Sequence, residues 1–163
     1  MATGVLRRIQ NYSLDDVKDS IKYLLDRASE SLEVRTLAIG ITAGKPDPVA
    51  AIYDFIKQNV SYIPDPVSNG HIELFTSPIR MVRDYRAGIP IGEDCDGMAI
   101  LATALYRSIG IRANVVLIDV GGNGLDHAYC QAYSDTLNDW VSVDPSSQFP
   151  LGWDIKYHDK VVV

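Results

Sequence analysis

The chain has 163 residues, of which 47% are hydrophobic, and this length and composition suit one globular domain with a sizeable core. Its 21 acidic residues outnumber its 15 basic residues, and the net charge of -6 argues against nucleic acid or an anionic membrane as a partner. The first residues contain no apolar segment typical of a signal peptide, and no stretch is long enough to span a bilayer. We therefore expect a cytoplasmic protein.

Helices are predicted to dominate the first half of the chain. Apolar residues recur there every three or four positions, and the predicted helices cover 14–28, 32–41, 49–59 and 78–87. Ser13 precedes the first helix as a capping residue, and Pro48 opens the third. The stretch at 62–70, YIPDPVSNG, is rich in turn residues, and its prolines exclude a regular helix.

A fifth helix is predicted within the sequence GEDCDGMAILATALYRSIG. Apolar residues recur at helical spacing after Cys95, and Gly110 ends the pattern. Cys95 should therefore lie in or just before the first turn, where the helix dipole favours a thiolate and Asp94 could cap the free N–H groups. Asp94 and Asp96 are also negative neighbours, which disfavour a thiolate unless they are paired or turned away.

Two other interpretations of Cys95 are available. A lone cysteine here can be an ordinary small helix residue. A calcium loop would place its first ligand at Gly92 and its last at Thr103, and neither residue supplies a carboxylate. We expect no metal and no cofactor.

The second half of the chain is predicted to form a small sheet. Alternating or β-branched segments cover 113–120, 128–133 and 140–143. In the segment DHAYCQAY, Ala128, Cys130 and Ala132 share the apolar face, which makes Cys130 a core residue rather than a nucleophile.

His127 and Asp144 are predicted to meet across a hairpin. The polar turn SDTLND joins their strands, and if Tyr133 pairs with Trp140, Asp144 lies one diagonal step from His127. A register shifted by two residues would place them directly opposite each other. A carboxylate bonded to one ring nitrogen orients the imidazole, so that the other nitrogen can exchange a proton with a nucleophile such as Cys95.

The segments GEDCDGMAILATALYRSIGIRANVV, HAYCQAY and WVSVDPSSQFPLGW, in this order, resemble the transglutaminase-like superfamily over roughly 47–153. The resemblance implies an α+β fold with a papain-like core, in which N-terminal helices pack on a small antiparallel sheet and the nucleophile lies at a helix N-terminus. One departure is that Gly-Asp-Cys appears here as Gly-Glu-Asp-Cys, which leaves the turn before the thiol undefined.

By this resemblance Cys95 is the nucleophile, His127 the general base and then acid, and Asp144 the residue that orients His127. The backbone N–H of Cys95 is expected to bind the oxyanion, and Tyr62 is a candidate second donor or else a packing residue at a turn. The loop at 121–126 is either a mobile rim over the cleft or an ordinary hairpin turn.

Hydrolysis of a peptide or related amide is the expected activity, with a peptide or protein as substrate. The alternatives are a protein-glutamine transglutaminase or deamidase, and a non-catalytic binding module on the same fold. We expect a single domain over 1–163, with a helical segment at 1–45, the catalytic core at 46–153 and a tail at 154–163. The tail is either an edge strand or a partner-binding segment.

Overall fold

The computed structural model describes residues 7–10, 13–64 and 72–163. The helices of these parts are α1 (Leu14–Ser29), α2 (Leu32–Thr42), α3 (Pro48–Asn59), α4 (Pro78–Arg86) and α5 (Cys95–Ser108). Each predicted helix is confirmed to within a residue or two at its ends. The turn-rich stretch at 62–70 falls largely outside the described residues.

Side chains that bind free backbone N–H groups define where the helices begin. Ser13 Oγ accepts a hydrogen bond from the backbone N–H of Asp16, and the Asp16 carboxylate accepts one from the backbone N–H of Ser13. Asp47 Oδ1 accepts from the N–H groups of Val49 and Ala50, at 3.0 and 3.1 Å. The starts of α1 and α3 are therefore specified by residues within one turn of them.

The main sheet is four-stranded and antiparallel, in the order β7-β6-β5-β8. Its strands are β5 (Ala113–Asp119), β6 (His127–Ser134), β7 (Asp139–Val143) and β8 (Asp159–Val162). Two strand pairs lie apart from this sheet: antiparallel β1 (Arg7–Gln10) with β3 (Ile72–Phe75), and parallel β2 (Val60–Tyr62) with β4 (Ile91–Glu93). These short strands were not predicted, because three or four residues carry too little alternation to be recognised.

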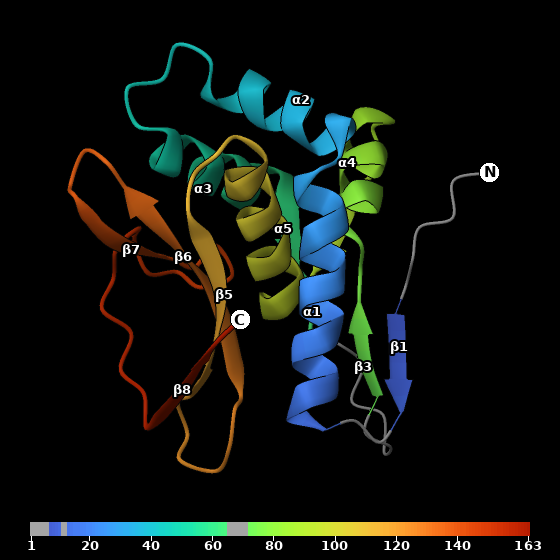
Figure 1. The fold of residues 1–163 in the computed structure, drawn as a ribbon, viewed down its shortest axis with the longest axis vertical. Coiled ribbons are helices and arrows are strands. Elements are labelled where there is room, and N and C mark those ends of the chain that lie inside the picture. The colour runs from blue at the N-terminus through green and yellow to red at the C-terminus, as the bar shows by residue number, and fades with distance from the viewer. Residues whose placement is uncertain (1–6, 11–12, 65–71) are drawn as a thin grey trace.

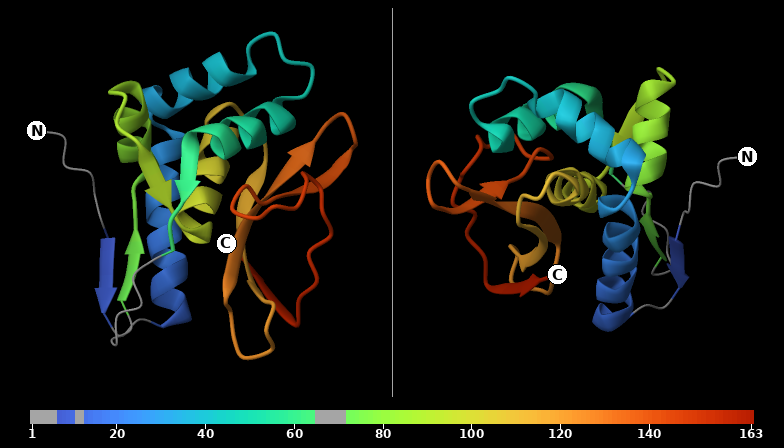
Figure 2. Two further views of the ribbon diagram at one scale, coloured as in Figure 1. Left: turned by 180° about the vertical axis from the view of Figure 1, so that it is seen from behind. Right: turned by 45° about the horizontal axis from the view of Figure 1, so that its top comes forward.

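Helix α5 lies between the sheet and the other helices (Figures 1 and 2). It is buried on nearly all sides from Gly97 to Tyr106, as expected for a helix that is apolar all round. The inner face of the sheet contributes Val115, Cys130 and Val143 to the same core. The α+β fold with a small antiparallel sheet is thus confirmed, with the refinement that α1, α2 and α4 contact α5 more than they contact the sheet.

The outer face of the sheet is covered by the C-terminal segment. Val116, Ile118 and Tyr129 form a second apolar cluster there, against which Ile155 packs. Beyond it, β8 pairs with β5, and the backbone N–H of Val163 donates to the carbonyl of Val115 at 2.8 Å. The tail was interpreted as either an edge strand or a partner-binding segment, and residues 159–162 form an edge strand.

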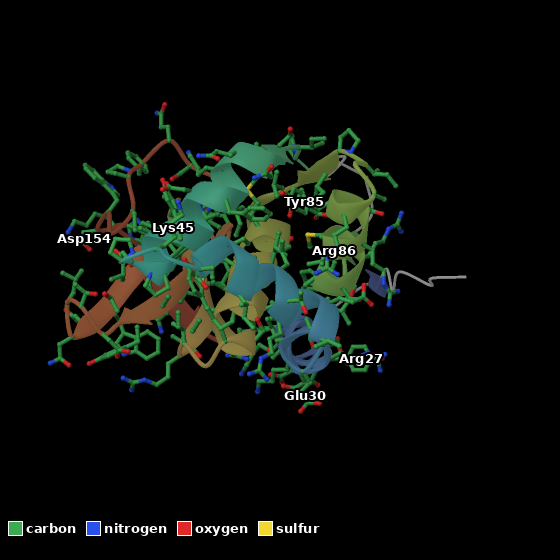
Figure 3. The ribbon with its side chains drawn as sticks, turned by 90° about the horizontal axis from the view of Figure 1, so that it is seen from above. Arg27, Glu30, Lys45, Tyr85, Arg86 and Asp154 are labelled. Atoms are coloured by element: carbon green, nitrogen blue, oxygen red, sulfur yellow. The ribbon has the colours of Figure 1, made fainter. Side chains whose placement is uncertain are left out.

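Several charged side chains lie at the periphery. Figure 3 looks down on the helices from above, and the exposed residues Arg27, Glu30, Lys45 and Asp154 extend from the outside of the fold. Within the described ranges, no helix is both long and apolar enough to cross a membrane.

Candidate active site

Cys95 is the first residue of α5, directly after the short strand β4 and the capping residue Asp94. Asp94 Oδ1 accepts a hydrogen bond from the backbone N–H of Gly97 at 3.0 Å. Glu93 belongs to the strand, and its carboxylate lies so close to Gly97 that a Cβ at that position would be 2.3 Å from Oε2. The additional acidic residue before the thiol is therefore explained: one residue ends β4 and the next caps α5.

His127 and Asp144 meet across the β6–β7 hairpin. Tyr133 pairs with Trp140, so that the pairing ends just before Asp144 and leaves it diagonal to His127. His127 Nε2 lies 2.8 Å from Asp144 Oδ2. This is the first of the two predicted registers, and the edge-to-face packing of Tyr133 on Trp140, with ring centroids 5.7 Å apart, stabilises it.

Cys95 lines the same pocket as His127 and contributes to the raised pKa of the imidazole, so the structure brings the three predicted residues together. Hydrogen bonds to Asp144 first and to Cys95 second raise the pKa of His127 to about 10, against the opposing effect of burial. Because Nε2 is bonded to the carboxylate, Nδ1 is the nitrogen left for the thiol. The arrangement can hold a proton on the imidazole at neutral pH.

Asp144 is held in its anionic form by its neighbours. Burial by itself would raise its pKa, but hydrogen bonds from His127 and Ser146 outweigh burial, and the pKa lies below its usual value. Ser146 Oγ donates to Asp144 Oδ1 at 2.6 Å, and the backbone N–H of Ser146 donates to the same oxygen at 3.2 Å. Ser146 was not predicted as part of the site, although a serine two residues after an aspartate is a known turn signal.

Tyr62 lies near the thiol. Strand β2 runs parallel to β4 with Tyr62 paired to Glu93, two residues before Cys95. Its side chain is 53% exposed, and its pKa is raised first by partial burial and then by electrostatic interaction with Cys95 and nearby carboxyl groups. The phenol is therefore neutral and able to donate a hydrogen bond near Cys95 at physiological pH.

The loop before His127 is braced by two aspartates. The Asp119 carboxylate accepts hydrogen bonds from the backbone N–H groups of Gly122, Asn123 and Gly124. The Asp126 carboxylate accepts hydrogen bonds from the backbone N–H groups of Val120 and Gly121. Of the two interpretations of this loop, the structure has a hydrogen-bonded hairpin turn with φ of 80° at Gly122 and 115° at Gly124.

Cys130 lies in the core, as its place on the apolar face of β6 predicts. It is 0% exposed, and burial raises its pKa to about 12 although Thr103 forms a hydrogen bond with it. Within the described parts of the chain, no three His, Cys, Asp or Glu side chains are grouped as metal ligands would be.

Residues 35–145 match the family model of the Transglutaminase-like superfamily. The fold is also similar to that of a candidate cysteine protease from Cytophaga hutchinsonii, with a TM-score of 0.55 and 21% identity over 97% of this chain and 60% of the other. A candidate protease from Parabacteroides distasonis matches with a TM-score of 0.52 and 17% identity, over 80% of this chain and 30% of its own. This chain thus spans less than two thirds of either protein. No curated protein sequence matches it.

Proposed function

This chain belongs to the transglutaminase-like superfamily, and from that premise we propose that it is a cysteine-dependent amide hydrolase acting on peptides or proteins. The observation that carries the proposal is the hydrogen bond between His127 and Asp144 at a pocket that Cys95 and His127 both line. A thiol, an imidazole and a carboxylate in this order are the parts of an acyl-transfer site.

In the proposed reaction the sulfur of Cys95 attacks the amide carbonyl while its proton resides on Nδ1 of His127. The carbon–nitrogen bond then breaks as His127 gives that proton to the leaving amine, which leaves a thioester on Cys95. Water, deprotonated by His127, cleaves the thioester and regenerates the thiol. Asp144 keeps the ring oriented and stabilises its positive charge throughout.

The oxyanion of the tetrahedral intermediate needs donors that are already in place. The backbone N–H of Cys95 has no partner within the helix, because the first amides of a helix lack one. Tyr62 is the proposed second donor, since its neutral hydroxyl lies close enough to Cys95 for the two groups to interact electrostatically. Tyr62→Phe should then lower kcat by about tenfold to a hundredfold with little change in KM.

Hydrolysis is favoured over amine transfer because the site is open to water: the His127 side chain is 24% exposed, beside a half-buried thiol. The test is to incubate the protein with casein and with a peptide mixture, and to count new amino termini by mass spectrometry. Cys95→Ala should abolish their formation without unfolding the protein, while the matched variant Cys130→Ala should retain activity.

Three outcomes would contradict the proposal. Incorporation of a fluorescent primary amine into casein, without release of new amino termini, would identify a transglutaminase. Release of ammonia without peptide cleavage would identify a deamidase. If no product forms and His127→Ala leaves the biological role of the protein intact, the chain is a binding module.

A further inference from the structure

A pocket of about 460 Å³ opens on one side of the Cys95–His127 pair. Leu14 and Val17 of α1 form one wall, and Leu117 and Leu125 from β5 and the following loop form the other. Its volume lies within the range of about 300–1,000 Å³ found for ligand sites. A substrate side chain next to the scissile amide could therefore enter it and bury an aliphatic stem.

The charge on this pocket is negative. Asp94 and Asp96 line it from the start of α5, and Asp126 lines it from the loop before β6. No lysine or arginine is among its described lining residues, and His127 is the only basic side chain there. With a net charge of -6 on the whole chain, the long-range field also attracts cations.

Two of the three carboxylates are held in place by backbone amides. Asp94 Oδ1 accepts from Gly97 N–H at 3.0 Å, and the two oxygens of Asp126 accept from Val120 and Gly121 at 2.8 and 3.0 Å. These bonds favour the ionised form of Asp126, whose pKa the hydrogen bond from Val120 lowers most. The negative groups are thus already positioned before a ligand arrives.

We propose that this pocket, called here the acidic pocket, binds a lysine or arginine side chain of the amide substrate, next to the bond that Cys95 attacks. An aliphatic stem matches the leucine and valine walls, and an ammonium or guanidinium group matches the three carboxylates. The proposal rests on the proposed function, because it names the substrate class of the same site. An acidic substrate side chain would meet repulsion from every aspartate of the pocket.

The first test does not require turnover. The native protein is treated with three methanethiosulfonates that carry an ammonium, a methyl or a sulfonate group, and the rate of mixed-disulfide formation at Cys95 is divided by the rate with free cysteine. In this reaction the thiolate displaces sulfinate, so that each reagent differs only in the group placed in the pocket. The ammonium reagent should exceed the sulfonate reagent by roughly tenfold at low salt, and added salt should reduce the ratio.

Equal rates, or faster reaction of the sulfonate reagent, would overturn the proposal. That result is physically possible, because a protonated His127 beside the thiol attracts anions. The experiment therefore decides whether the three carboxylates or the imidazolium dominates the field in the pocket.

A substitution in the apolar wall provides the second test. Leu125 is 37% exposed at the rim of the pocket and takes no part in the Cys95–His127–Asp144 hydrogen bonds. Leu125→Lys should remove or reverse the preference for the ammonium reagent, whereas the matched variant Leu125→Met should keep it. If Leu125→Lys leaves the preference unchanged, the reagent does not pass through this pocket.

Peptide pairs then test the substrate class itself. Peptides that differ only in lysine or norleucine beside the scissile bond should show a preference for lysine in kcat/KM of roughly twofold to tenfold. A preference for norleucine or glutamate would overturn the assignment. If no peptide is cleaved by a Cys95-dependent reaction, the hydrolase proposal fails, and the ratio of reagent rates still decides whether the pocket selects cations.

Discussion

Cys95 and Cys130 carry the same thiol on two elements that pack against each other, α5 and β6, and their surroundings are opposite. Cys95 begins a helix, is half-buried and lines a pocket together with His127. Cys130 is fully buried among apolar side chains. The comparison predicts that the two thiols differ in reactivity according to their place in the fold, one at a helix terminus and one inside a sheet face.

The largest expected effect is the difference in alkylation between the two thiols. In the native protein near neutral pH, iodoacetamide should label Cys95 at least about a thousandfold faster than Cys130, because Cys130 reacts only when the core opens. Peptide mass spectrometry over a time course measures both rates. In denaturant the two alkylation rates should become similar. Similar rates in the native protein would contradict the prediction that the fold makes Cys95 more reactive than Cys130.

Removing the imidazole should bring Cys95 closer to an ordinary thiol. His127→Ala should slow alkylation of Cys95 by about tenfold or more near neutral pH, because the group that accepts its proton is lost, and should leave Cys130 unchanged. His158→Ala is the matched control, since that histidine is exposed and lies outside the site. If Cys95 is labelled at an unchanged rate in His127→Ala, the reactivity of its thiol does not depend on the imidazole.

The raised pKa of His127 also predicts a pH dependence of stability. Its pKa rises from an ordinary 6.5 to about 10 in the folded protein, so its stabilising contribution is complete below about pH 6.5 and is lost as the pH rises through 10. Relative to His127→Gln, the wild type should lose about 1–2 kcal/mol of unfolding free energy over this range, after allowance for solvent screening. Urea unfolding at a series of pH values measures the unfolding free energy of both proteins. If the two free energies change in parallel with pH, the prediction is wrong.

Removal of the buried thiol should affect stability and leave the site unchanged. Cys130→Ala should lower the unfolding free energy by about 1–2 kcal/mol, because it leaves a small cavity and removes a hydrogen bond with Thr103. Thermal unfolding measures this loss, and alkylation of Cys95 should not change. A change in Cys95 labelling would show that the two thiols are coupled through the packing of α5 on β6.

The predicted helices were close to the observed ones because their signals are local. Capping residues such as Ser13 and Asp47 and apolar repeats act within one or two helical turns, so a single sequence contains them. Strand pairing is not local. The sequence allowed two registers for the hairpin, because a shift by two residues keeps every side chain on the same face of the sheet. In the observed register Tyr133 packs on Trp140, and Arg112 lies over the Tyr133 ring.

The contacts that support the site could not be predicted from the sequence, although Tyr62 itself was a candidate donor. Ser146 acts only because it folds back onto Asp144, and Tyr62 comes close to Cys95 only because β2 pairs with β4. The bracing of the loop by Asp119 and Asp126 likewise depends on backbone amides that the turn brings together. Each of these contacts requires a chain conformation that residue spacing does not specify.

By itself, the sequence determined the helices, the strands of the β5–β6–β7 meander, and the places of three residues: Cys95 at a helix start, His127 on β6 and Asp144 directly after β7. These features depend on periodicity and strand alternation, which are properties of neighbouring residues. The tertiary structure alone decided the hairpin register, the parallel pairing of β2 with β4, the strand β8 and the acidic pocket. The physical reason is that each of these joins segments far apart in the chain, whose approach is selected by packing of the whole core.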